Sequence, residues 1–186
     1  MEEYYIFPGR FQPFHNDHLV VVRSTVAQTD GILLIGIVIH TLDLEDCSTF
    51  ETEARLQNSP DRNPFSPLER LSMVKGCIEE ELSEISNRIL TILLPRPEAN
   101  WRLIEAMFPS RRTWVVPDAG EEFDDMKAQF FASKGDVVMR IPITPSTNGY
   151  LVRNAILNGS TEWQRSVPVT IARQIENILA RGTRNG

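Results

Sequence analysis

Cysteine is scarce in this sequence. Cys47 and Cys77 are the two cysteines among 186 residues, and their wide separation excludes a disulfide framework or a cysteine-rich zinc site. The first ten residues, MEEYYIFPGR, are acidic where a secretory signal needs a basic start, and no apolar run approaches the length of a membrane span. We therefore expect a cytoplasmic protein with no membrane partner.

Positive charge is also limited. The chain has 19 Lys and Arg residues against 25 Asp and Glu residues, a net charge of −6, which disfavours broad binding to nucleic acid or to anionic membranes. Hydrophobic residues make up 41% of the sequence. This length and composition suit a single domain over residues 1–186 with one substantial core.

Five short apolar runs are typical of β-strands. They are expected at residues 4–7, 32–39, 89–94, 113–116 and 137–141. The second run, ILLIGIVI, contains no polar side chain, which is typical of a strand buried on both faces of a sheet. Residues 41–62 form the one long irregular connection and are expected to be a loop.

Helical periodicity separates these runs. Residues 17–28 place Leu19, Val22 and Val26 on one helical face. A second helical face is expected from apolar residues at positions Leu68, Leu71, Val74, Ile78, Leu82 and Ile85. Ser66, Pro67 and Glu69 form a start signal for that helix.

Shorter helices are expected over residues 100–107 and within a helical C-terminal segment, residues 148–182. In that segment Gly149 precedes a short helix that Asn158 and Gly159 can end. The last helix is expected to start near Pro168 and to bury some or all of its apolar residues, Val169, Ile171, Ile175 and Leu179.

Strands that alternate with helices predict an α/β fold with a doubly wound parallel sheet of about five strands. In such folds ligands bind beyond the carboxyl ends of the strands. The stretch GRFQPFHNDH, residues 9–18, is the loop that leaves the first expected strand. Its side chains are therefore expected at the ligand site.

The residue types in this stretch suit an anion. Gly9 allows a sharp turn, Arg10 offers a fork of donors, and His15 and His18 flank the start of a helix. A helix N-terminus presents unpaired N–H groups and the positive end of the helix dipole, so phosphates bind there readily. The alternative is that both histidines only pack and cap, with Asn16 or Asp17 as an ordinary N-cap.

The stretch GRFQPFHNDH resembles the phosphate-binding motif of the nucleotidylyltransferase superfamily, in particular that of archaeal-type nicotinamide mononucleotide (NMN) adenylyltransferases. NPFSPLER, residues 63–70, resembles the segment that opens the second helix of those enzymes. NGYLVRNAILNGSTEWQRSVP, from residue 148, resembles their C-terminal signature. The resemblance implies a Rossmann-like domain that joins NMN to the AMP part of ATP with Mg²⁺, giving NAD and pyrophosphate. It also implies a homo-oligomer.

The resemblance implies roles for individual residues. His15 and His18 would hold the ATP phosphates, Arg153 would bind the β and γ phosphates, and Arg10 would complete this catalytic set. The ATP and phosphate site would comprise Gly9, Phe11, Asp17, Asn148, Gly149 and Arg153. The NMN site would comprise Trp101, Arg70 and Glu98. For Trp101 the alternative is core packing, and for Arg70 it is a solvated position on a helix.

The chain departs from the family pattern at several positions. Asp17 replaces a glycine that lets adenine lie against the helix, so its side chain is expected to obstruct the base. Asn148 and Tyr150 replace a serine and a threonine of the C-terminal signature.

Three hypotheses follow. The first, which we favour, is a working NMN adenylyltransferase or a close relative that uses another mononucleotide or triphosphate. The second is a nucleotide-binding relative with weak or lost transferase activity, serving as a sensor or an assembly subunit. The third makes His15, Asp17 and His18 ligands of a transition metal. Three ligands within four residues at a helix start rarely converge on one ion, so we expect no metal site there.

Overall fold

The computed structural model describes residues 3–39 and 63–182 and shows a parallel sheet with the strand order β3-β2-β1-β4-β5. The strands are β1 (Tyr4–Gly9), β2 (Ile32–Ile39), β3 (Ile89–Pro95), β4 (Arg112–Asp118) and β5 (Val137–Pro142). The predicted doubly wound α/β fold is therefore confirmed. The loop expected over residues 41–62 lies outside the described residues.

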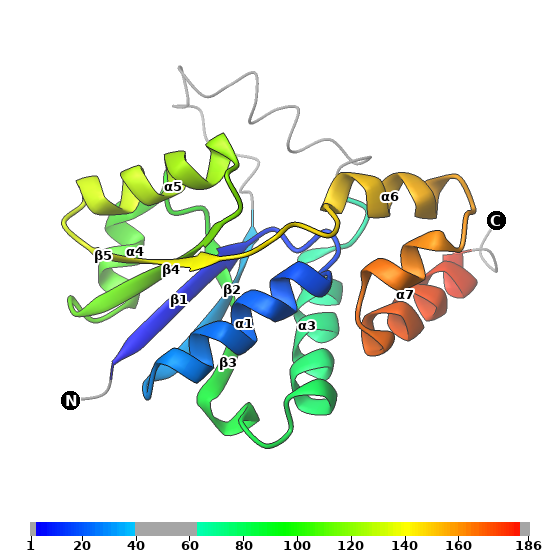
Figure 1. Ribbon diagram of the computed structural model, residues 1–186, viewed down its shortest axis with the longest axis horizontal. Helices are drawn as coiled ribbons and strands as arrows, with labels where there is room; N and C mark the ends of the chain where they lie inside the picture. Colours follow the sequence, from blue (N-terminus) through cyan, green and yellow to red (C-terminus); the bar gives the residue numbers. More distant parts are fainter. Residues whose placement is uncertain (1–2, 40–62, 183–186) are drawn as a thin grey trace.

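Helices cover both faces of the sheet (Figure 1). Helices α1 and α3 lie on one face, and α4 and α5 lie on the other, while α7 packs beside α3. The helices are α1 (Asn16–Gln28), α3 (Pro67–Glu81), α4 (Trp101–Met107), α5 (Glu122–Ser133), α6 (Gly149–Leu157) and α7 (Val169–Gly182), with short 3-10 turns η2 (Ser86–Arg88) and η3 (Glu162–Ser166). None of the helices in residues 3–39 and 63–182 is both long enough and apolar enough to span a membrane.

The core forms two apolar layers because successive strand residues point to opposite faces of the sheet. Phe7 and Ile35 join the layer under α1 and α3, which also receives residues of α6 and α7. Ile6 and Trp114 join the layer under α4 and α5. Strand β2 contributes to both layers, as its continuous apolar run predicted.

Several boundaries differ from the sequence predictions. Helix α3 begins with the predicted capping box of Ser66 and Glu69, but it ends at Glu81, so Ile85 lies beyond it. Leu68 was expected on the buried face and is 70% exposed, because it lies in the first turn of α3, away from the sheet. Helix α5 was not predicted. Its first turn contains three acidic residues, which obscure the apolar periodicity.

In α7 the apolar positions divide. Ile171 and Ile175 are fully buried, whereas Val169 and Leu179 are exposed. The two buried isoleucines lie four residues apart, which places them on the same face of the helix. That face packs against α3, and hydrogen bonds from Thr170 and Arg173 to Glu80 of α3 add to the attachment.

A buried ion pair at the amino end of β4 generates a stability prediction. Asp136 accepts hydrogen bonds from Arg112 Nε at 2.6 Å and from Trp114 Nε1 at 2.7 Å. Replacing Asp136 with Ala leaves a buried guanidinium without its counter-charge, so we expect the free energy of unfolding to fall by about 3 kcal/mol. Denaturant titration measures this loss.

The matched control removes an exposed carboxylate from a neighbouring ion pair. Glu3 lies 3.2 Å from Arg111, and both side chains are largely exposed. Replacing Glu3 with Ala is expected to cost less than about 1 kcal/mol, because water replaces the lost partner. Equal losses in the two variants would contradict the assignment of a buried, structural role to Asp136.

Candidate active site

The loop that follows β1 lies where the strand order reverses. Strand β1 pairs with β2 on one side and with β4 on the other. In an open parallel sheet this reversal leaves a crevice at the carboxyl ends of the two central strands, and ligands bind there. Residues 10–15 connect the carboxyl end of β1 to the start of α1, so the motif lies at this crevice as predicted.

Gly9 and Phe11 set the path of this loop. A Cβ atom on residue 9 would lie 2.5 Å from Cζ of Phe11, so any larger residue there would displace the buried Phe11 ring. Phe11 itself has a φ of +49°, a strained conformation for a large side chain. Its buried ring packs against Phe7, Phe14 and His18. The side chain of Phe11 therefore supports His18, and a role in ATP binding would fall to its backbone.

The two histidines form a stacked pair at the start of α1. Their ring centroids lie 3.6 Å apart, and Nδ1 of His18 accepts a hydrogen bond from the backbone N–H of His15 at 3.1 Å. His15 is the N-cap residue of α1, so the alternative that Asn16 or Asp17 caps this helix is wrong. His15 is only 8% exposed, and its side chain faces the backbone N–H of His18 in a reciprocal capping box, but its Nδ1 atom makes no full hydrogen bond among the described residues.

The surroundings hold both histidines neutral at neutral pH. Burial lowers the pKa of His15 to about 4, assisted by the charge of Arg153 and opposed by Asp17. Burial also lowers the pKa of His18 well below its usual range, assisted by His15 and by the charge of Lys127. Arg153 and Lys127 therefore lie close enough to the pair to act on it electrostatically.

Asp17 connects the start of α1 to the segment before α6. Its carboxylate accepts hydrogen bonds from the backbone N–H groups of Ser146 and Thr147, at 3.0 and 3.1 Å, and from the hydroxyl of Ser146. Asp17 is 6% exposed. Its charge, at the first turn of α1, is thus offset by three donors and by the positive end of the helix dipole.

Two buried arginines outside this loop donate hydrogen bonds to its backbone carbonyl groups. Arg70, on α3, donates from Nη1 to the carbonyl groups of Arg10 and Val38. Arg153, on α6, donates to the carbonyl of Gln12 at 2.7 Å. Arg70 is 4% exposed, so the alternative of a solvated position is wrong, and burial lowers its pKa to about 10. The predicted contacts of both arginines with nucleotide stay predictions.

Gln12 was not predicted as a site residue, but its side chain also holds this loop in place. Its side-chain amide donates to the carbonyl of Phe65 at 2.8 Å and accepts from the N–H of Phe65 at 3.2 Å. It thereby fastens the loop to the segment before α3. A glutamine in a polar loop carries no sequence signal of such a role, because its partner is 53 residues away.

The start of α6 has the geometry that the sequence indicated. Asn148 is the N-cap residue and accepts a hydrogen bond from Leu151 N–H at 2.9 Å. A Cβ atom on Gly149 would lie 2.9 Å from Nη1 of Arg153, so this glycine leaves room for the guanidinium. Asn158 and Gly159 end the helix, as predicted. The N-termini of α1 and α6 are thus joined through Asp17 and Gln12.

The structure does not bring every predicted site residue to the crevice. The ring of Trp101 packs against Trp114 and Phe130 and lies 5.1 Å from the guanidinium of Arg112, at the amino end of β4. This position favours the packing interpretation over contact with a nicotinamide. Glu98 follows the carboxyl end of β3 and forms an ion pair with Arg96 at 3.5 Å. Its role in NMN binding stays a prediction.

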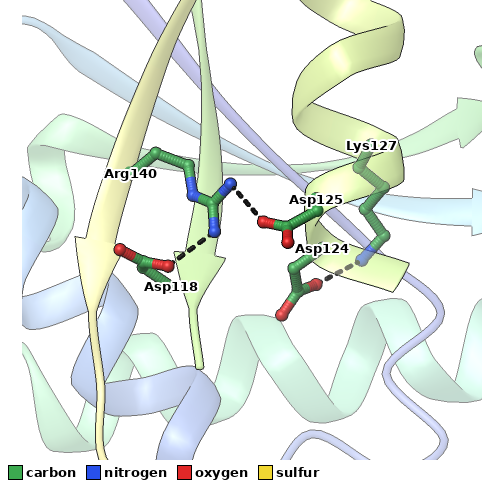
Figure 2. Close-up of polar contacts among 5 residues, drawn as sticks. All are labelled: Asp118, Asp124, Asp125, Lys127 and Arg140. Atoms are coloured by element: carbon green, nitrogen blue, oxygen red, sulfur yellow. Dashed lines mark hydrogen bonds and ion pairs between the residues drawn. The ribbon is translucent and has the colours of Figure 1, made fainter. Parts of the chain in front are cut away.

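A group of charged residues at the ends of β4 and β5 was missed in the sequence (Figure 2). Arg140, on β5, bridges Asp118 at the end of β4 and Asp125 on α5. Lys127 pairs with Asp124 at 3.2 Å within α5. Asp124, Asp125 and Lys127 lie in EEFDDMK, residues 121–127, where four acidic residues precede one lysine. Such a run of charge predicts only a solvated helix face. Their place beside the crevice follows from the strand order.

His15, Asp17 and His18 do not converge on one point. The carboxylate of Asp17 is directed to Ser146 and Thr147, whereas the two rings stack on each other. Across residues 3–39 and 63–182 there is no group of three or more His, Cys, Asp or Glu side chains that could hold a metal ion. The geometry therefore does not support the transition-metal hypothesis.

The contacts of Asp17 predict a local and a global effect. Replacing Asp17 with Ala removes the acceptor of three hydrogen bonds, so we expect the free energy of unfolding to fall by about 2 kcal/mol. The amides of Ser146 and Thr147 are expected to exchange with deuterium faster. Asp125→Ala is the control, because the carboxylate of Asp125 is 53% exposed, and its free energy of unfolding is expected to change less. If the amides of Ser146 and Thr147 stay protected from exchange in Asp17→Ala, the hydrogen bonds from Asp17 do not hold this segment.

The buried histidines predict a loss of stability in acid. The folded-state pKa of His15 lies near 4, below its unfolded value near 6.5, so the unfolded chain binds the proton first as pH falls. Neutral His15 contributes up to roughly 3 kcal/mol to the free energy of unfolding. This contribution is fully present above about pH 6.5 and is lost by about pH 4. His15→Asn is expected to flatten the unfolding free energy across this range, and an unchanged slope would be the contrary result.

Comparison with known proteins supplies a family context for this site. No protein-family model matches the chain. Its sequence is 26% identical over 176 residues to a nicotinamide-nucleotide adenylyltransferase of Pyrobaculum aerophilum, covering 93% of this chain and 87% of the relative. It is 28% identical over 181 residues to that of Thermococcus kodakarensis, covering 93% and 82%.

A solved structure shares the fold. A bifunctional NMN adenylyltransferase/ADP ribose pyrophosphatase of Francisella tularensis, in complex with AMP and a manganese ion, aligns with a TM-score of 0.61 and 17% identity. The alignment covers 90% of this chain and 44% of that one. Over almost its whole length, the chain is thus similar in sequence to archaeal nicotinamide-nucleotide adenylyltransferases, which confirms the resemblance that its motifs indicate.

Proposed function

We propose that the protein is an adenylyltransferase that joins NMN to the AMP part of ATP and releases pyrophosphate. The observation that carries the proposal is the stacked pair of His15 and His18 at the N-terminus of α1, where the buried Nδ1 of His15 makes no full hydrogen bond among the described residues. A buried nitrogen without a partner is costly, and a phosphate oxygen could supply that partner. The names of the sequence relatives support the same reaction.

The reaction needs positioning and charge rather than covalent catalysis. An oxygen of the mononucleotide phosphate attacks the α-phosphorus of ATP, and the bond from that phosphorus to the bridging oxygen breaks. His15 and His18 would donate hydrogen bonds to phosphate oxygens, and Arg10 and Arg153 would offset their charge. Because both histidines begin neutral, bound phosphates would raise their pKa values, so ATP affinity would increase as the pH falls.

The charge of Asp17 is compatible with this proposal. Near phosphates an isolated carboxylate would be unfavourable, but three donors of Ser146 and Thr147 offset its charge. Mg²⁺ would arrive with ATP as part of the substrate, because Mg²⁺ is commonly bound through substrate phosphates with few protein ligands.

Pyrophosphate release from purified protein tests the proposal. The assay contains Mg²⁺ and ATP, with NMN, nicotinate mononucleotide or another mononucleotide as acceptor. We expect release that depends on NMN, with NAD formed in equal amount. No release with any acceptor, while calorimetry still detects ATP binding, would instead support a nucleotide-binding relative without transferase activity.

His18→Asn tests the histidine pair without removing its structural hydrogen bond. The asparagine oxygen can replace Nδ1 as the acceptor of the His15 N–H, but the other ring nitrogen is lost. We expect kcat/KM to fall at least about 100-fold, with a Tm change of a few degrees. A loss of folding with the activity per folded molecule unchanged would make His18 purely structural.

A further inference from the structure

We infer that Lys127 is a further catalytic residue, whose ammonium contacts the reacting phosphates from the α5 side of the crevice. This inference rests on the proposed function. It concerns the side of the site opposite His15 and His18, where the sequence motifs place no residue.

The topology brings Lys127 to the crevice. Strands β1 and β4 are neighbours, α1 follows β1, and α5 follows β4. The first turns of the two helices therefore lie on either side of the point where the strand order reverses. Lys127 is in the second turn of α5, and its charge contributes to the lowered pKa of His18. The two helices thus begin beside the same point from opposite faces of the sheet, and the charge of Lys127 acts on His18.

Local contacts hold the ammonium but leave it able to bind a ligand. Nζ of Lys127 lies 3.2 Å from Oδ1 of Asp124 and 4.4 Å from the ring centroid of Phe123. An ammonium has three donors, and Asp124 accepts from one of them. The side chain of Lys127 is 20% exposed, against 12% for Asp124. The lysine is therefore positioned by a buried acid while still open to solvent.

The neighbouring cation is less suited to this role. Arg140 is held between the carboxylates of Asp118 and Asp125, which offset its charge twice (Figure 2). Lys127 is paired with Asp124 in the same view, to the right of the Arg140 group. Of these two cations, Lys127 thus keeps more of its charge for a ligand.

The chemistry gives a further cation on this side a role beside Arg10 and Arg153. Two anionic phosphates must approach each other, and the neutral histidine pair brings no charge of its own. The attacking oxygen forms the new bond to the α-phosphorus, and the electron pair of the broken bond leaves with pyrophosphate. Lys127 stays protonated throughout and transfers no proton. Its charge would offset the repulsion between the phosphates and the negative charge that develops on them in the transition state.

The test compares Lys127→Met and Lys127→Arg with the wild-type protein. Lys127→Met is expected to lower kcat about 100-fold at saturating ATP and mononucleotide, with Tm changed by only a few degrees. Lys127→Arg keeps the charge and is expected to restore kcat to within about 10-fold of wild type. Lys75→Met is the matched control, because Lys75 also pairs with an acid on a helix but is 67% exposed; its kcat is expected to be unchanged.

A second measurement tests the position of Lys127 independently of turnover. NMR titration of the imidazole protons is expected to show a higher His18 pKa in Lys127→Met than in the wild type, because a nearby positive charge is lost. An unchanged His18 pKa would place Lys127 away from the pair and overturn the inference.

The outcomes separate this inference from the proposed function. Wild-type turnover together with full activity of Lys127→Met would overturn the role of Lys127 alone. If the wild type does not turn over, the proposed function fails, and the affinity for NMN measured by calorimetry then tests Lys127. An affinity for NMN about 10-fold lower in Lys127→Met than in the wild type would support a contact between Lys127 and the phosphate. Equal affinity, or no binding by either protein, would overturn the inference.

Discussion

Two buried arginines donate hydrogen bonds to the backbone carbonyls of the loop that follows β1, and the arrangement of the site depends on these contacts. Arg70 reaches this loop from α3, and Arg153 reaches it from α6. Gln12 adds a pair of hydrogen bonds to Phe65. Because these donors come from distant parts of the chain, the loop can form only when the domain has folded. A strained Phe11 is tolerated because its surroundings fix it on several sides.

The same contacts explain the electrostatic character of the crevice. The arginines are used as structural donors to carbonyl groups, and the histidines are desolvated and neutral. Carboxylates accompany most of the remaining charge: Asp17 faces the segment before α6, and Asp124 pairs with Lys127. In a site of this kind, each positive charge lies a short distance from a negative counter-charge. Phosphates would then compete with internal carboxylates for the same donors.

Much of the fold was predictable because apolar periodicity is a local property of the chain. All five strands were expected within a few residues of their observed bounds, and the capping box of Ser66 and the cap of Asn148 were read from short spacings. Helix α5 was missed because its acidic first turn hides its buried face. The predicted burial of Leu68 was wrong, since burial depends on which neighbour a helix face meets.

By itself, the sequence determined the succession of the strands and of the helices other than α5, the position of the histidine motif at a strand end, and the similarity to adenylyltransferases. These follow from contiguous residues. Only the tertiary structure decided that Arg70 is buried, that Trp101 packs near Arg112, and that Asp17 faces Ser146 and Thr147. Each of these depends on segments far apart in the chain, and their meeting is set by strand order and packing rather than by local residue spacing.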